Sequence, residues 1–313
     1  MAATRCAENA TNVDEFLLVG LHILPELKQF FFVIFLMIYV LTLAGNSLIV
    51  VTVFASDHLH SPMFFLLSNF SFLEIWYSTS TAPSMLSGIL ADGNSISFAG
   101  CLMQFYFFTC FAAIECFLLT VMAYDRYTAI CFPLHYTTLM DRRQCLKLTS
   151  IAWAGGFTLP FVTLILLCRL KFSGEKLINH FFCEFSPLLK ATCSDTSFLE
   201  VYVFFIYFVI LLVPFILIVM SYAYIMSAIF KISSATGRHK AFSTCSSHLT
   251  VVSAYFGPLI AIYATPTSES SRNLSKGLSV LYSAITPLLN PIIYTLRNKE
   301  IREAWRKSFH KTS

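Results

Sequence analysis

The stretch that decides the fold class is MAYDRYTAIC, residues Met122–Cys131, which ends an apolar segment that begins near Phe98. Asp125 and Arg126 place opposite charges side by side at the end of a run long enough to cross a bilayer. Such a pair is costly in a membrane unless it has partners or lies at the water boundary. Arg126 could simply extend to the lipid headgroups and mark the helix end, or the pair could have a function.

The composition of the rest of the chain is that of a helical membrane protein. Of its 313 residues, 57% are hydrophobic and only 12% are charged, and the mean hydropathy is +0.70. A soluble domain has about twice that charged fraction. Apolar runs of membrane-spanning length recur along the whole chain, which excludes a sizeable soluble domain. The net charge of +4 gives no indication of nucleic-acid binding.

The apolar segments predict an all-α membrane protein with a seven-transmembrane helix bundle. The first 26 residues, 1–26, are polar and lack the basic start and apolar core of a cleaved signal peptide. A long polar connection, 168–197, follows the fourth segment, and a basic tail, 297–313, follows the seventh. Within the bundle, 27–296, the predicted helices are about 27–54, 62–86, 98–131, 145–167, 198–230, 239–263 and 276–296.

The basic residues predict an extracellular N-terminus. With this orientation thirteen Lys and Arg residues lie on the cytoplasmic side and eight outside. Asn9 then stands in a glycosylation sequon on the outer side. In the cytoplasmic tail, Ile301, Trp305 and Phe309 are four residues apart among basic residues. This spacing predicts a short amphipathic helix on the inner leaflet after the seventh helix.

Five cysteines lie on the expected outer, oxidising side, Cys6 and four that suggest a bridged loop. Cys101 begins the third segment and Cys183 lies midway along the connection 168–197, so a bridge between them would hold this loop over the bundle. Cys168 and Cys193 stand at the two ends of the same loop and could pair with each other. The sequence alone leaves this connectivity open.

Two acidic residues, Glu74 and Glu115, lie in the middle of the second and third segments. Buried carboxylates are costly, so both are expected to face the bundle interior. Asn46 and Asn290, on the first and seventh segments, could join them as oxygen ligands of a cation. The two acids could instead share a proton, or belong to a hydrogen-bonded structural network that holds no ion.

Several motifs in this chain are family signatures. The general ones are Asp125-Arg126-Tyr127 and the run NPIIY at 290–294. The longer blocks are LHSPMFFL at 59–66, MAYDRYTAIC at 122–131, SY at 221–222, KAFSTCSSHL at 240–249 and PLLNPIIY at 287–294. In these blocks the chain resembles the rhodopsin-like (class A) G-protein-coupled receptors, and within them the odorant (olfactory) receptors. The resemblance covers nearly the whole chain.

The resemblance implies an inner switch at Asp125 and Arg126, with Arg126 released towards helices five and seven when the sixth helix moves. The switch and G-protein-coupling set comprises Asp125, Arg126, Tyr127, Tyr222, His248, Asn290, Pro291 and Tyr294. The resemblance also implies the bridges Cys101–Cys183 and Cys168–Cys193. Glu74 and Glu115 match the acidic pair of this family, where a sodium ion could bind.

One departure from the family pattern concerns the pivot of the sixth helix. The family usually has Phe-Tyr-Gly there, whereas this chain has Tyr255-Phe256-Gly257. The hydroxyl at the second position is lost, which puts in doubt a hydrogen bond from the pivot to a ligand or to the third helix. In the second-helix block, Phe64 replaces the usual Tyr.

The helical period predicts a ligand pocket in the outer half of the bundle. Its expected residues carry no charge and few hydroxyls, which favours a small, apolar, neutral ligand held by burial and one or two hydrogen bonds. Each residue could instead make a helix–helix or lipid contact. The predicted set is Phe105, Phe108, Thr109, Ala112, Val203, Ile206, Tyr207, Phe256, Leu259, Ile260 and Tyr263.

The expected function is therefore that of an odorant receptor in the plasma membrane, by resemblance in the cilia of olfactory sensory neurons. Its partners would be a small odorant, the lipid bilayer and a heterotrimeric G protein of the stimulatory, olfactory type, which raises cAMP. The alternatives are a class A receptor for a non-odorant hydrophobic ligand and an ion- or proton-coupled transporter, although internal repeats are not visible. A retinal protein needs a lysine in mid-helix, whereas Lys276 lies only at the outer edge of its segment. No nucleophile–base arrangement indicates an enzyme.

Overall fold

The computed structural model describes residues 14–20, 23–56, 59–91, 93–172, 177–264, 269–297, 301 and 303. The side chains of 240, 244, 263–273 and 295–297 are outside this description. Asn9 and most of the basic tail, including Trp305 and Phe309, also lie outside it. The glycosylation site and the tail helix therefore stay predictions.

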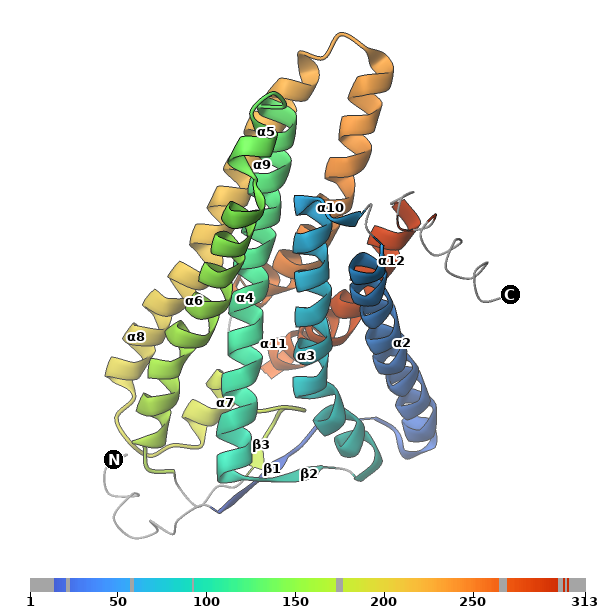
Figure 1. The fold of residues 1–313 in the computed structure, drawn as a ribbon. Helices are drawn as coiled ribbons and strands as arrows, with labels where there is room; N and C mark the ends of the chain where they lie inside the picture. Colours follow the sequence, from blue (N-terminus) through green and yellow to red (C-terminus); the bar gives the residue numbers. More distant parts are fainter. Residues whose placement is uncertain are drawn as a thin grey trace.

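Seven long helical segments make up the described bundle (Figure 1). The third, α4, has the predicted bounds, whereas the second continues to Ala91 and the seventh begins at Glu269, seven residues earlier than expected. The extension of the seventh segment, residues 269–275, is polar and needs no hydrocarbon around it, whereas that of the second, residues 87–91, carries the apolar Ile89 and Leu90. The segments are α2 (Lys28–Ala55), α3 (Pro62–Ala91), α4 (Phe98–Cys131), α6 (Arg142–Cys168), α8–η3–α9 (Ser197–Tyr207, Phe208–Leu212, Val213–Phe230), α10 (Ala235–Ala264) and α11–η4–α12 (Glu269–Val280, Leu281–Ile285, Thr286–Arg297).

Six of these segments are long and apolar enough to cross a membrane by length and composition. The remaining one, α3, has 30 residues, including Glu74 and many serines and threonines, and it packs between α2 and α4. Most of its side chains are buried by protein, so its polar groups are shielded from lipid. The structure thus agrees with a seven-helix membrane bundle.

Two segments contain a wider π-type turn, η3 in the fifth helix and η4 in the seventh. Each turn is followed within a few residues by a proline, Pro214 or Pro287. Proline lacks an amide N–H and cannot complete the regular helical hydrogen bonds. Turns of this type are frequent at functional sites, and both line the cavity described below.

One end of the bundle carries a small sheet that the sequence did not suggest. Strand β1 (Glu15–Leu18) pairs antiparallel with β2 (Asn94–Ser97) and parallel with β3 (Leu177–Ile178). Figure 1 shows these strands gathered with α7 (Phe185–Lys190) at the end opposite α5 (Tyr136–Leu139). Phe16 and Leu18 of β1 are buried in an apolar cluster with residues of the loop between α6 and α8. This burial explains why part of the N-terminal region forms a strand here.

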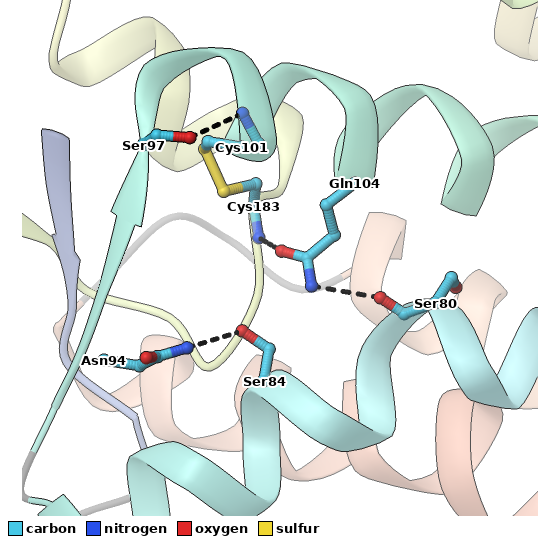
Figure 2. The surroundings of a disulfide bond; sticks show 8 residues. Ser80, Ser84, Asn94, Ser97, Cys101, Gln104 and Cys183 are labelled. Carbon is cyan, nitrogen blue, oxygen red and sulfur yellow. Dashed lines mark hydrogen bonds between the residues drawn. A yellow bond between two sulfur atoms is a disulfide. The ribbon is translucent and has the colours of Figure 1, made fainter. Parts of the chain in front are cut away.

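The disulfide Cys101–Cys183 fixes the loop between α6 and α8 to the start of α4 (Figure 2). Beside it, Gln104 Oε1 accepts a hydrogen bond from the Cys183 amide at 3.1 Å, and Gln104 Nε2 donates one to the Ser80 carbonyl oxygen at 3.0 Å. The loop is therefore joined to two helices, α3 and α4. The predicted Cys101–Cys183 bridge is present.

The second predicted bridge, Cys168–Cys193, is wrong. Cys168 is a free cysteine whose side chain is exposed at the last position of α6. Cys193 is disulfide-bonded, and its Sγ lies 3.6 Å from the carbonyl oxygen of Lys171. The placement of two cysteines at the ends of one loop did not determine their pairing, since Cys168 is the last residue of α6 and its free side chain is exposed.

Candidate functional site

A cavity lies in the half of the bundle next to the sheet, between α4, α6, the fifth helix, α10, η4 and the loop before α7. About 90 Å³ is open to the centre of a water molecule, several times the space that one water needs. The wall is mostly aromatic and aliphatic. It consists of Phe105, Phe108, Thr109, Ala112, Ala113, Pro160, Thr163, Glu184, Phe185, Ile206, Tyr207, Ile210, Leu211, Tyr255, Leu259, Ile262 and Tyr282.

The cavity contains most of the predicted ligand residues on α4 and the fifth helix. Phe105, Phe108, Thr109, Ala112, Ile206, Tyr207 and Leu259 all line it. Three predicted residues lie elsewhere. Val203 is buried in the apolar cluster under the outer loop, Phe256 packs on Phe215 of α9 with ring centroids 5.4 Å apart, and Ile260 is 49% exposed on the outer face of α10. The side chain of Tyr263 is outside the described part.

The Tyr255 side chain forms one inner boundary of the cavity. Its hydroxyl donates a hydrogen bond to the Ala112 carbonyl oxygen on α4 at 3.0 Å and lies 3.8 Å from Cys116 Sγ. The pivot of the sixth helix therefore does bond to the third helix, through the first position of Tyr255-Phe256-Gly257. Although Phe256 has no hydroxyl, Tyr255 supplies the hydrogen bond from the pivot to the third helix.

Polar groups in the cavity wall are few. Thr109 Oγ1 is engaged within its own helix, since it donates to the Phe105 carbonyl oxygen at 2.5 Å. Glu184, which directly follows the bridged Cys183, brings a carboxyl group to the cavity. The expectation of a pocket wall without charge is therefore wrong. Helical periodicity does not extend to Glu184, which reaches the cavity from the loop before α7.

Deeper in the bundle, a cluster of buried polar side chains joins four helices. Asn290 Nδ2 on α12 donates to Glu74 Oε1 on α3 at 2.5 Å. Asn46 Nδ2 on α2 donates to the carbonyl oxygen of Pro287 at 3.2 Å. The carboxyl groups of Glu74 and Glu115 lie close enough to interact directly. Glu74, Glu115 and Asn290 thus lie together as expected, whereas the hydrogen bonds of Asn46 in the described chain go to the backbone of Thr42 and Pro287.

This cluster leaves five buried oxygens without a hydrogen-bond partner in the described part of the chain. They are Glu115 Oε1 and Oε2, Glu74 Oε2, Asn46 Oδ1 and Asn290 Oδ1. Buried acceptors without donors are unfavourable, and two adjacent carboxylates repel each other. A cation bound by oxygen ligands would relieve both costs, and so would a proton shared by the acids.

At the other end of α4, Asp125 organises a polar group. Its Oδ2 accepts from Arg126 Nε at 2.9 Å and also contacts the Arg126 terminal nitrogen Nη2. Its Oδ1 accepts from the Tyr136 hydroxyl of α5 at 2.7 Å. Burial and the neighbouring Asp125 carboxylate raise the pKa of Tyr136, which therefore stays protonated as a donor. Tyr127 packs against the rings of Phe132 and Tyr224.

Beside this group, the fifth and sixth helices meet through Tyr222 and His248. The Tyr222 hydroxyl lies 2.8 Å from His248 Nδ1, and the two rings stack at an angle of 16°. Tyr294 on α12 has a buried hydroxyl without a partner among the described residues. Pro291 lies against Gly45, where an added Cβ would approach the proline ring to 3.0 Å. Asp125, Arg126, Tyr222 and His248 thus lie in polar contacts towards the α5 end of the bundle, whereas Asn290 belongs to the buried cluster with Glu74.

Comparison with known proteins decides the family. A family model described as "Olfactory receptor" matches residues 35–312. Olfactory receptor 6B9 of Mus musculus is 46% identical over 301 residues, covering 96% of this chain and 95% of the relative. Olfactory receptor 10A5 of Homo sapiens is 47% identical over 304 residues, covering 97% and 96%. The chain belongs to the olfactory receptor family. Like the rest of this family, the receptor is a multi-pass membrane protein and not an enzyme.

Sequence reasoning missed several cavity residues of the receptor. Pro160 and Thr163 on α6, Glu184 and Phe185 in the loop and Tyr282 in η4 all line the cavity. The periodicity of one helix does not show how far a neighbouring helix tilts or where a loop descends. Only Pro287, two residues after η4, could have pointed to this segment from the sequence.

Proposed function

We propose that this olfactory receptor binds small, mostly apolar odorants in the cavity around Tyr255 and activates a stimulatory heterotrimeric G protein that raises cAMP. The observation that carries the proposal is the position of this cavity. It touches α4 and α10 at the same place where Tyr255 joins them through Ala112. A ligand in the cavity therefore contacts the link between the third and sixth helices.

The inner ends of the same helices supply the G-protein side of the proposal. Asp125 holds Arg126 and Tyr136, and Tyr222 holds His248. A shift of α10 would disturb the Tyr222–His248 contact, because His248 lies on α10 and its partner Tyr222 on α9. Such two-state contacts are what ligand binding can bias. Arg126 is then freed towards the G protein.

A sodium ion bound between Glu74 and Glu115 is part of the proposal. The five unpartnered oxygens of the buried cluster fit a hard cation, which prefers carboxylate and amide oxygens. The ion would hold α3, α4, α2 and α12 in one arrangement. A shared proton is the competing explanation, and the sodium dependence of signalling distinguishes the two.

We further propose that the N-terminus and the sheet face the outside of the cell, in the plasma membrane and in the cilia of olfactory neurons. This orientation rests on the excess of basic residues at the α5 end of the bundle. The free, exposed Cys168 offers a test. A membrane-impermeant maleimide should label it on intact cells, and Cys168→Ser should remove most of the label. Labelling that requires permeabilised cells would contradict the orientation.

The central experiment is a cAMP assay in cells that express the receptor with an olfactory-type or stimulatory Gα subunit. Members of a broad odorant panel should raise cAMP. At equal surface expression, Arg126→Ala should lower this response by a factor of about ten or more. An active odorant whose signal is unchanged in Arg126→Ala and in Asp125→Asn would contradict the proposed coupling. A panel without any active member, with the receptor present at the surface, would contradict the ligand class.

A further inference from the structure

The loop residue Glu184 is held rigidly at the outer side of the cavity. The preceding residue, Cys183, is bridged to Cys101 and donates its amide to Gln104 Oε1 at 3.1 Å. The Glu184 carbonyl oxygen accepts from the Leu188 amide at 3.1 Å, which starts α7. Both neighbours thus fix its backbone. The side chain is 31% accessible and lines the cavity.

The carboxyl group of Glu184 has no hydrogen-bond donor among the described residues. Its nearest ionisable neighbour is His180, whose Nε2 lies 3.2 Å from Glu184 Oε2. This contact lacks hydrogen-bond geometry, since both ring nitrogens of His180 are without a partner in the described chain. A carboxylate that faces a cavity and has free acceptor positions favours a ligand that brings a donor.

We propose that Glu184 sets the ligand specificity of the cavity by accepting a hydrogen bond from a donor at one end of an otherwise apolar odorant. The odorant would place a hydroxyl or ammonium group at Glu184 and its apolar body between Phe105, Ile206 and Tyr255. This inference rests on the proposed function, because it assigns the substrate class of the same cavity. It also predicts discrimination against isomers that only accept hydrogen bonds.

The charge state of Glu184 decides between the two donor types. Although 31% of its side chain is accessible, the surrounding protein desolvates the carboxyl group and raises the pKa of Glu184 to about 7. On the same loop, burial and the charge of Lys276 on α11 lower the pKa of His180 to about 3, so His180 is neutral at physiological pH. Alcohols can bind to either form of Glu184. An alkylamine, protonated below a pKa of about 10, gains most from the carboxylate and should lose potency as the pH falls from 8 to 6.

The experiment compares isomers that differ only in the donor. The cAMP response is measured for hexan-1-ol and methyl pentyl ether, for benzyl alcohol and anisole, and for 2-phenylethanol and benzyl methyl ether, with hexylamine and benzylamine as cationic probes. In the wild-type receptor, alcohols should be at least about tenfold more potent than their isomeric ethers, as expected for one hydrogen bond to a charged group. Amines should show the stated pH dependence.

Three variants assign this preference to Glu184. Glu184→Gln keeps an acceptor and should retain the alcohol preference but lose the pH-dependent gain for amines. Glu184→Leu should reduce the potency of alcohols to that of ethers, and an unchanged ether response would show that the receptor is intact. Glu200→Gln is the matched control, since this exposed acid bonds to Thr196 outside the cavity. It should behave as wild type.

The outcomes separate the two levels of the proposal. Equal potency of alcohols and ethers in the wild type, or an alcohol preference that survives in Glu184→Leu, would overturn the role of Glu184 while leaving the odorant-receptor function in place. If Glu184→Leu does not reach the surface, the pH dependence of amines in Glu184→Gln decides. Persistence of that dependence would overturn the role. If no probe raises cAMP through the wild-type receptor at normal surface expression, the proposed function is overturned and this inference with it.

Discussion

The Tyr255 hydroxyl donates a hydrogen bond to the Ala112 carbonyl oxygen, and this bond joins α10 to α4 at the boundary of the cavity. Tyr255 itself is fully buried. The carbonyl oxygen of Ala112 belongs to the regular part of α4, so it can keep its intrahelical partner when α10 moves. The contact can therefore be broken at modest cost, which suits a helix that shifts during signalling.

Tyr255→Phe should raise the basal cAMP level. The change removes one hydrogen bond, worth about 1 kcal/mol, from the arrangement seen here, and a shift of that size changes a two-state ratio about fivefold. The measurement is ligand-free cAMP at equal surface expression. Tyr39→Phe is the matched control, because it removes a tyrosine hydroxyl bond to Thr79 between α2 and α3. Basal activity raised equally by both variants would point to general loosening instead.

Tyr136→Phe should also raise basal signalling, through the inner end of the receptor. Among the described residues, two groups hold the Asp125 carboxylate, the hydroxyl of Tyr136 and the guanidinium of Arg126. Its removal leaves Arg126 as the remaining partner and weakens the position of α5 against α4. An increase of about two- to fivefold is expected, in line with about 0.5–1 kcal/mol for one hydrogen bond. Asp125→Asn should exceed it. Lower basal cAMP in both variants would contradict the holding role of Asp125.

The sequence predicted the fold better than the site, for a physical reason. Hydrophobic length alone identifies helices such as α4, because lipid demands long, internally bonded segments. The grouping of Glu74 with Glu115 followed from the cost of burying charge. By contrast, the sheet at β1, the path of Cys168 and the descent of Glu184 into the cavity depend on loop geometry and tertiary packing. Loop segments carry no periodic signal that could reveal them.

Gly156→Ala should destabilise the receptor, because α6 packs closely against α4 at this position. A Cβ at Gly156 would lie 2.2 Å from Ile114 Cγ1 and 3.2 Å from the carbonyl oxygen of Cys110. Overpacking of this kind costs about 1–3 kcal/mol. The neighbouring Gly155→Ala is the control, since its Cβ would meet only Phe117 at an ordinary 3.5 Å. Thermal unfolding of the purified receptor in detergent should start at a lower temperature for Gly156→Ala alone. Equal melting of the two variants would show that Ile114 and α6 adjust freely.

Glu115→Gln should abolish any sodium dependence of odorant potency. Both oxygens of the Glu115 carboxyl group are buried without a donor, next to Glu74, so this group would supply much of the negative charge that attracts a cation. The amide of glutamine keeps the size but carries no charge, and a neutral site binds sodium weakly. Potency is measured with sodium replaced by N-methylglucamine at constant ionic strength, with Glu200→Gln as a control acid far from the cluster. In the wild type and the control, sodium should shift potency several-fold, and in Glu115→Gln it should not. A shift that persists in Glu115→Gln would rule out an ion between these acids. A wild-type receptor that ignores sodium but responds to pH, with that response lost in Glu115→Gln, would assign the pair a shared proton.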